Sequence, residues 1–193
     1  MANDSKPPPP PTETTLHQAA LAYLARYSAT SATLARTLNR HIDRWARSSE
    51  GDDVAAQTAA AKRIVREVVA RLAAAGAVDD ATFAQARSRR LLRTGHSRRA
   101  AAAHLAARGV PAEVVATALP DDAGQELAAA VAFARRRRIG PFAVQQPDAP
   151  AADRRRQDLG ALARAGFSRE TAERALDMAP GAADAMLAEL RRS

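Results

Sequence analysis

Clustered arginines are the side chains with the clearest chemical potential in this sequence. Between Ala81 and Val110 there are seven arginines and no aspartate or glutamate. Guanidinium groups bind phosphate and carboxylate through planar, paired hydrogen bonds. The cluster therefore predicts contact with nucleic acid or an acidic protein surface, and the alternative is a helix face that meets only solvent. The candidate binding residues are Arg87, Arg90, Arg93, Arg98, Arg99, Arg155 and Arg156.

The positions of these arginines along the chain indicate which of them can face the same ligand. Arg87 and Arg90 are three residues apart on one predicted helix, and Arg98 begins the next. Arg135–Arg138 are consecutive, so their side chains point around a helix and cannot all face one ligand. We therefore favour Arg87, Arg90 and Arg98 over the run at 135–138.

Three pairs of aspartates could in principle carry out acid–base chemistry or hold Mg²⁺. Each pair precedes a predicted helix, where capping of free backbone amides is the favoured role; the pairs are Asp52-Asp53, Asp79-Asp80 and Asp121-Asp122. His96 and His104 lack ligand spacing and are interpreted as core or surface filler. The chain has no cysteine and no glycine-rich phosphate loop. We therefore expect no enzyme activity, no metal and no cofactor.

The composition narrows the classes of partner and the cellular compartment that we expect. The 193 residues carry a formal charge of +8, and Lys6 and Lys62 are the only lysines among 29 basic residues. A GC-rich genome could explain the preference for arginine, but it does not explain the clustering. The aromatic content of 4% argues against a stacking platform for single strands. The start of the chain lacks a signal-peptide pattern, and the longest apolar run, Leu127–Ala134, is too short to cross a membrane. We expect a cytoplasmic protein without membrane contact.

The apolar periodicity predicts helices throughout and no strands. Glycine at 76, 95 and 109 is expected to end helices, and Pro111 fits the first position of a helix. The predicted helices cover about 15–26, 31–47, 54–75, 80–93, 98–108, 111–119, 122–138, 152–165 and 169–179. Pro7–Pro11 favours a disordered leader over a proline-rich docking motif.

An internal repeat organises these helices. Residues 97–119 align without a gap with residues 154–176, at an offset of 57, and a weaker copy begins at Thr30. The predicted parts are a disordered tail (1–13), three helical repeats (14–75, 79–119 and 121–178) and a short helix or tail (181–193). One such repeat buries too little apolar surface to be stable alone. The fold class that we predict is therefore all-α, an elongated, curved array of three tandem three-helix repeats.

Four motifs in this order resemble the RecX family of regulatory proteins. The first is Ala20-Leu21-Ala22-Tyr23-Leu24, followed by Arg26 and Thr30. The second combines Leu72, Gly76, Val78-Asp79-Asp80 and Phe83-Ala84. The others are Leu105 with Gly109-Val110, and Leu162 with Gly166-Phe167-Ser168. The resemblance covers about residues 16–178. Thr33, Thr37 and the acidic loop at 48–54 depart from the family pattern.

The resemblance implies a regulator of the RecA recombinase. Members bind along the RecA–DNA filament and usually dampen ATP hydrolysis and strand exchange, which places them in DNA repair, homologous recombination and the SOS response. The implied partners are the RecA filament and single- and double-stranded DNA, with salt-dependent affinity, and the expected state is a monomer. Two alternatives remain: a stand-alone helix-turn-helix-like DNA-binding repressor, and an adaptor that binds only protein. The Ala-rich helices around residues 98–119 contain no Asn or Gln, which counts against base-specific readout.

Overall fold

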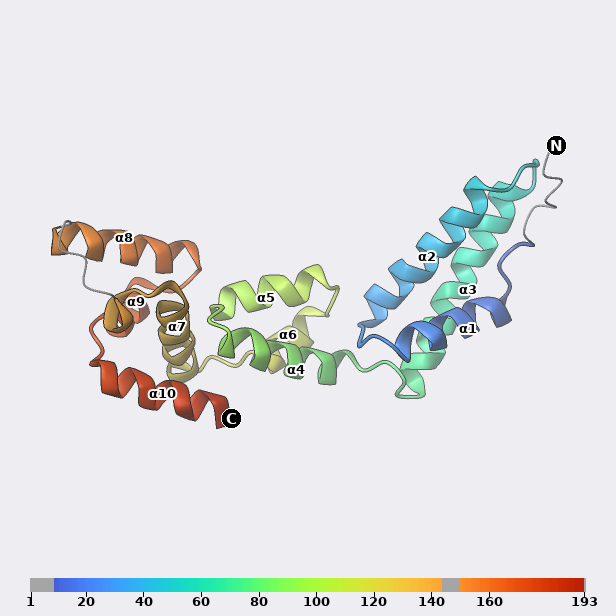
Figure 1. The fold of residues 1–193 in the computed structure, drawn as a ribbon. Coiled ribbons are helices and arrows are strands. Elements are labelled where there is room, and N and C mark those ends of the chain that lie inside the picture. The colour runs from blue at the N-terminus through green and yellow to red at the C-terminus, as the bar shows by residue number, and fades with distance from the viewer. Residues whose placement is uncertain (1–8, 144–149, 193) are drawn as a thin grey trace. The chain divides into compact units, whose positions relative to one another are not determined.

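Helices make up all the regular structure in the part of the chain that the computed structural model describes, residues 9–143 and 150–192. This confirms the prediction of an all-α fold (Figure 1). The elements are α1 (Glu13–Leu24), α2 (Ser31–Arg47), α3 (Val54–Ala74), α4 (Asp80–Arg93), α5 (Arg98–Ala107), α6 (Ala112–Ala118), α7 (Ala123–Arg137), the 3-10 helix η1 (Gly140–Phe142), α8 (Ala151–Arg164), α9 (Arg169–Leu176) and α10 (Pro180–Arg192). None of the helices in these residues is both long and apolar enough for a membrane crossing.

Side-chain caps fix most helix starts where the sequence predicts them. Thr30, Ser97 and Ser168 accept hydrogen bonds from amides three residues ahead. Asp79 and Asp122 do the same at the starts of α4 and α7. The hydrogen bonds to the side chain and amide of Thr82 lower the pKa of Asp79. Two of the three aspartate pairs therefore cap helices.

The structure corrects the sequence-based prediction at two helix starts. Pro111 is the N-cap of α6 and not its first residue, because its ψ of 147° is extended. Asp53 makes no capping hydrogen bond, because its backbone is already near the helical region at φ −85° and ψ −8°. The final helix α10 has thirteen residues, and it buries Ala183 and Leu187. It is therefore a packed element.

The described chain divides into two compact units. Unit 1 runs to Phe83 and includes Arg108–Val110, whereas unit 2 comprises 84–107 and the chain from Pro111 onward. In unit 1, α3 packs against α1 and α2. Its core consists of Leu16, Ala20, Leu34, Leu38, Ile42, Ala61, Val65, Val68, Val69, Leu72 and Val78. Trp45 is also buried here.

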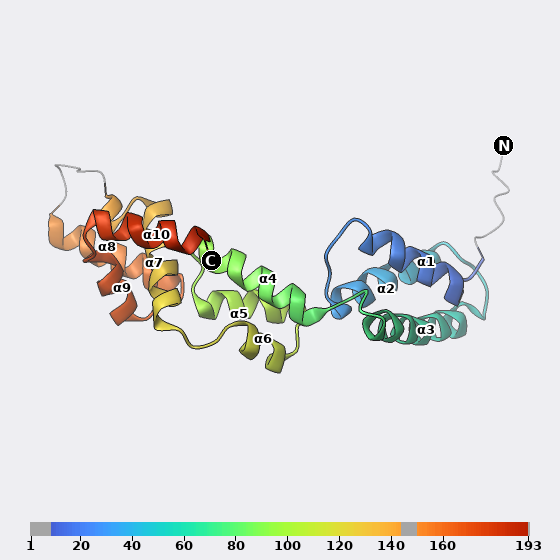
Figure 2. The same ribbon diagram turned by 90° about the horizontal axis from the view of Figure 1, so that it is seen from below.

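Helix α7 is the centre of the C-terminal part of unit 2. The apolar run Leu127–Ala134 lies in it and is buried except at Ala132. Helices α8, α9 and α10 all pack against α7, and both views show α10 alongside it (Figure 2). The same helix therefore supplies the core and, beyond Ala134, four consecutive arginines.

The N-terminus of α2 is held by two groups that are distant in sequence. The hydroxyl of Thr30 is fully buried and lies 2.7 Å from the carbonyl oxygen of Arg108, to which it donates. The amide of Ser31 donates to the Asp80 carboxylate at 2.7 Å. At this helix start, a hydroxyl donates to a carbonyl that is distant in sequence, and an amide donates to a distant carboxylate. We call this pair of contacts a long-range cap.

Helix α5 begins with a second long-range cap. The buried hydroxyl of Ser97 donates to the carbonyl oxygen of Ala165 at 2.7 Å, and the Arg98 amide donates to Glu126 at 2.8 Å. Burial raises the pKa of the Glu126 carboxyl. The two accepting carbonyls precede Gly109 and Gly166, glycines that correspond in the sequence repeat. The sequence repeat therefore corresponds to a repeated contact, in which a buried hydroxyl donates to the carbonyl of the residue before a glycine.

Candidate nucleic-acid interface

A hollow of about 670 Å³ lies in unit 2 where the ends of α4 and α7 meet α10. Five arginines line it, together with three apolar residues and one threonine. We call it the arginine groove, and its residues are Arg93, Thr94, Ala132, Arg135, Arg136, Arg138, Leu187, Leu190 and Arg191. Both views show the end of α10 next to the end of α4 (Figures 1 and 2). Arginines from three helices are therefore gathered around one concave surface.

Gly95 brings the end of α4 against α7. Its φ is +80°, and a Cβ atom there would lie 2.6 Å from the backbone nitrogen of Phe133. Only glycine permits both the positive φ and this close approach. Arg136 then fixes the contact, because its guanidinium donates to the carbonyl oxygen of Thr94 at 2.8 Å. These contacts place Arg93 beside the arginines of α7.

The end of α7 turns three of its four consecutive arginines to the groove. Arg138 is the C-cap with φ 56° and ψ 47°, so it leaves the helical path. Arg137 does not line the groove, and its guanidinium lies 5.7 Å from the centre of the Phe133 ring. Arg137 is therefore the one arginine of this run that does not line the groove. The left-handed cap nevertheless allows Arg135, Arg136 and Arg138 to share one surface.

Few acids compensate the charge of the groove. Arg135 is 3.9 Å from the exposed Asp184 carboxylate. Arg93, Arg138 and Arg191 form no ion pair with residues 9–143 or 150–192. All three are exposed. An anion that enters the groove therefore meets guanidinium groups that are free to bind it.

The predicted arginines around α4 and α5 divide into two sets. The guanidinium of Arg87 donates to Nε2 of His104 at 3.0 Å, so His104 has a structural contact. Arg98 donates to the carbonyl oxygen of Leu119 at 2.9 Å. Arg90 and Arg99 are exposed and form no ion pair in the described part of the chain. Arg93 is the member of this region that lines the groove.

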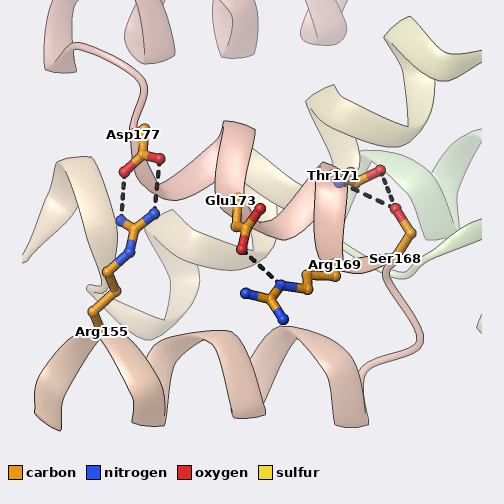
Figure 3. Close-up of polar contacts among 6 residues, drawn as sticks. All are labelled: Arg155, Ser168, Arg169, Thr171, Glu173 and Asp177. Atoms are coloured by element: carbon orange, nitrogen blue, oxygen red, sulfur yellow. Dashed lines mark hydrogen bonds and ion pairs between the residues drawn. The ribbon is translucent and has the colours of Figure 1, made fainter. Parts of the chain in front are cut away.

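Arg155 and Arg156 lie elsewhere, on α8. Arg155 forms a two-pronged ion pair with Asp177, with Nη2 2.8 Å from Oδ2 (Figure 3). This contact lowers the pKa of the Asp177 carboxyl. Arg156 pairs with Asp153 one turn earlier on the same helix. The structure therefore does not bring the predicted binding residues into one site.

Four arginines of the groove are not among the binding residues predicted from sequence: Arg135, Arg136, Arg138 and Arg191. A signal for them exists, since α4, α7 and α10 each carry arginine in the last turn. Cations are favoured at that end of a helix by the helix dipole. Clusters of three or more His, Asp or Glu residues that could hold a metal ion do not occur within the described residues.

Comparison with known proteins identifies the chain's relatives. A family model described as the second three-helix domain of RecX matches residues 79–119. The chain is 38% identical over 170 residues to Regulatory protein RecX of Myxococcus xanthus (strain DK1622), covering 86% of this chain and 87% of that protein. It is 34% identical over 96 residues to Regulatory protein RecX of Agrobacterium fabrum (strain C58 / ATCC 33970), half of each chain.

A solved structure shares the fold. The crystal structure of RecX from Lactobacillus salivarius matches with a TM-score of 0.60 at 16% identity, covering 94% of this chain and 97% of that one. The helical fold is thus kept although most residues differ. The identity and coverage of the Myxococcus xanthus relative show that this chain belongs to the RecX family of regulatory proteins.

Proposed function

We propose that this protein regulates recombination by binding the RecA–DNA filament, and that the arginine groove contacts the DNA backbone. Family membership supports the regulatory role. The observation that supports the DNA contact is that three guanidinium groups around one hollow, those of Arg93, Arg138 and Arg191, form no ion pair with any described residue. Binding of the regulator is expected to inhibit RecA ATP hydrolysis and strand exchange, without catalysis by the regulator itself.

The lining of the groove favours backbone contact over base reading. Asn and Gln, which read adenine edges, are not among its lining residues, and Thr94 is its one neutral polar side chain. Phosphate contacts of this kind bind any sequence. This supports a filament regulator over the alternative, a stand-alone helix-turn-helix-like repressor, which needs a base-reading helix.

The three unpaired arginines set the expected salt dependence. If each neutralises one phosphate, the slope of log affinity against log salt is about −2 on single-stranded DNA. Replacing Arg93, Arg138 and Arg191 with glutamine should abolish most of that slope and weaken binding at low salt. The matched control replaces Arg26, Arg63 and Arg66, which are exposed arginines of unit 1 without an ion pair in the described chain.

The deciding experiment measures RecA ATPase and strand exchange on single-stranded DNA with the native protein and both triple variants, across a salt series. Inhibition by the native protein and by the control, lost in the groove variant, supports the proposal. Unchanged RecA activity with tight duplex binding supports the repressor. Equal loss in both triple variants would mean that net charge, and not the groove, determines binding.

A further inference from the structure

A second hollow, of about 530 Å³, lies between α8 and α9 of unit 2. We call it the α8–α9 hollow, and its lining residues are Ala152, Arg155, Arg156, Leu159, Gly160, Ala163, Arg169 and Ala172. Figure 3 shows Arg155 rising from α8 and Arg169 descending from α9 into the space between the two helices. It shares no residue with the arginine groove.

The floor of this hollow is apolar, and its polar lining is entirely cationic. Leu159, Gly160 and Ala163 of α8 face Ala172 of α9, and no aspartate or glutamate lines the space. An apolar concavity exposed to water favours an apolar side chain of a partner. Guanidinium groups around it favour carboxylates over ammonium groups on the same partner.

Gly160 enlarges the floor of the hollow, and no contact among the described residues requires glycine at this position. It lies inside α8, where glycine destabilises a helix relative to alanine. A Cβ atom at this position would meet only the end of the flexible Arg164 side chain, at 3.3 Å. No backbone strain and no close helix packing requires glycine here. The space that it leaves is therefore available to an external group.

Internal acids hold the cationic rim in place without filling the hollow. Arg155 is paired with Asp177, and Arg169 donates through Nε to Glu173 at 2.8 Å (Figure 3). The two Nη groups of Arg169 keep their donors free, and 86% of its side chain is exposed. An incoming carboxylate can therefore bind Arg169 without breaking its internal pair.

We propose that the α8–α9 hollow binds a short segment of a protein partner that carries one large apolar side chain flanked by carboxylates. The apolar side chain fills the floor above Gly160, and the carboxylates bind Arg169 and Arg156. This goes beyond the proposed contact of the arginine groove with DNA. It gives unit 2 a protein-binding surface that is separate from its nucleic-acid surface.

The test is an NMR titration of the full-length, ¹⁵N-labelled protein with a blocked nonapeptide that has a central phenylalanine and two glutamates on each side. We expect amide shifts at Gly160 and Ala163. Binding should be at least tenfold weaker for a peptide with serine in place of phenylalanine, and for one with lysine in place of glutamate. Equal binding of the serine peptide, shifts outside α8 and α9, or the same amides moving with oligo-dT would overturn the proposal.

Matched variants locate the binding in the hollow. Gly160→Leu fills the floor and should weaken the phenylalanine peptide at least tenfold, whereas Gly160→Ala should leave its binding within about twofold of the native protein, since a methyl group removes little of the space. Arg169→Gln alters an exposed side chain, so it keeps the test decisive if Gly160→Leu does not fold. It should weaken the peptide severalfold without changing oligo-dT binding. Retained peptide affinity in both Gly160→Leu and Arg169→Gln would exclude the hollow as the site.

Discussion

Removal of one buried hydroxyl tests whether the long-range cap stabilises unit 2. In Ser97→Ala, the amide of Ala100 loses its capping oxygen at 3.2 Å, and the carbonyl of Ala165 loses its donor at 2.7 Å. The lost N-cap should cost about 1 kcal/mol. The unmet carbonyl should add about 1–2 kcal/mol. We therefore expect the free energy of unfolding to fall by about 2–3 kcal/mol.

Ser168→Ala is the matched control. Ser168 caps α9 in the same way, by accepting from the Thr171 amide at 3.1 Å, but it is exposed and bonds within its own turn (Figure 3). Its loss should cost only the local cap, about 1 kcal/mol. The difference between the two variants, about 1–2 kcal/mol, measures the distant bond to Ala165.

Urea unfolding followed by far-UV circular dichroism reports the helices of both units, and the part of the transition that tryptophan fluorescence does not follow gives the values for unit 2. Trp45 is the only tryptophan and is buried in unit 1, so its fluorescence follows that unit separately. Thr30→Ala removes the corresponding hydroxyl in unit 1 and should shift the fluorescence transition by a similar amount. If Ser97→Ala costs no more than Ser168→Ala, the long-range cap is only a local cap and the reasoning fails.

Three further predictions concern unit 2. Gly95→Ala should lower the free energy of unfolding by about 2–4 kcal/mol, from the positive φ and the clash with Phe133, in the same urea assay. Burial raises the folded-state pKa of Glu126, so ionisation of this carboxyl should lower the free energy of unfolding as pH rises through that pKa. In Glu126→Gln, the urea midpoint should lack this part of its pH dependence. The pKa of Asp177 is lowered by Arg155, so the stability from this pair is present above the unfolded pKa and disappears as pH falls through the folded one. In Arg155→Gln, the urea midpoint should lack this acid-side loss, and an unchanged acid profile would contradict the assignment.

Local chemistry explains which parts of the fold could be predicted from sequence. A helix start depends on a few adjacent residues, so Asp79-Asp80 and Asp121-Asp122 could be predicted as caps without knowledge of the fold. The same holds for the helix breaks at Gly76 and Gly95, where a positive φ is needed. The assignment failed at Asp53, because the loop before it already brings the backbone close to the helical region.

Contacts between residues that are distant in sequence could not be predicted from local patterns. Nothing in the types of Ser97 and Ala165 indicates that they meet across 68 positions. The same limit applies to the candidate site. Arg87 seemed free to bind a ligand by spacing alone, yet His104 holds it. Arg191 joins the groove only because α10 packs back on α7. The division into three repeats stays a proposal.

The arginine groove and the α8–α9 hollow differ in where their arginines lie along the helices. Arg93, Arg138 and Arg191 lie in or just after the last turns of α4, α7 and α10, where the helix dipole favours a cation. These arginines can therefore stand close together without acidic partners. Their guanidinium groups form no ion pair with residues 9–143 or 150–192, which supports the proposed contact with phosphate.

The arginines of the α8–α9 hollow are placed at the opposite ends of their helices. Arg169 is the first residue of α9, where the dipole opposes a cation, and Arg155 and Arg156 lie in the second turn of α8, where the dipole no longer contributes much. Each of the three is paired with an internal carboxylate. Any anion at the hollow meets guanidinium groups whose charge an internal carboxylate already offsets, whereas Arg93, Arg138 and Arg191 of the groove form no ion pair in the described part of the chain. We therefore expect nucleic acid to favour the groove, and the hollow to favour a partner whose apolar side chain supplies binding energy that charge alone does not.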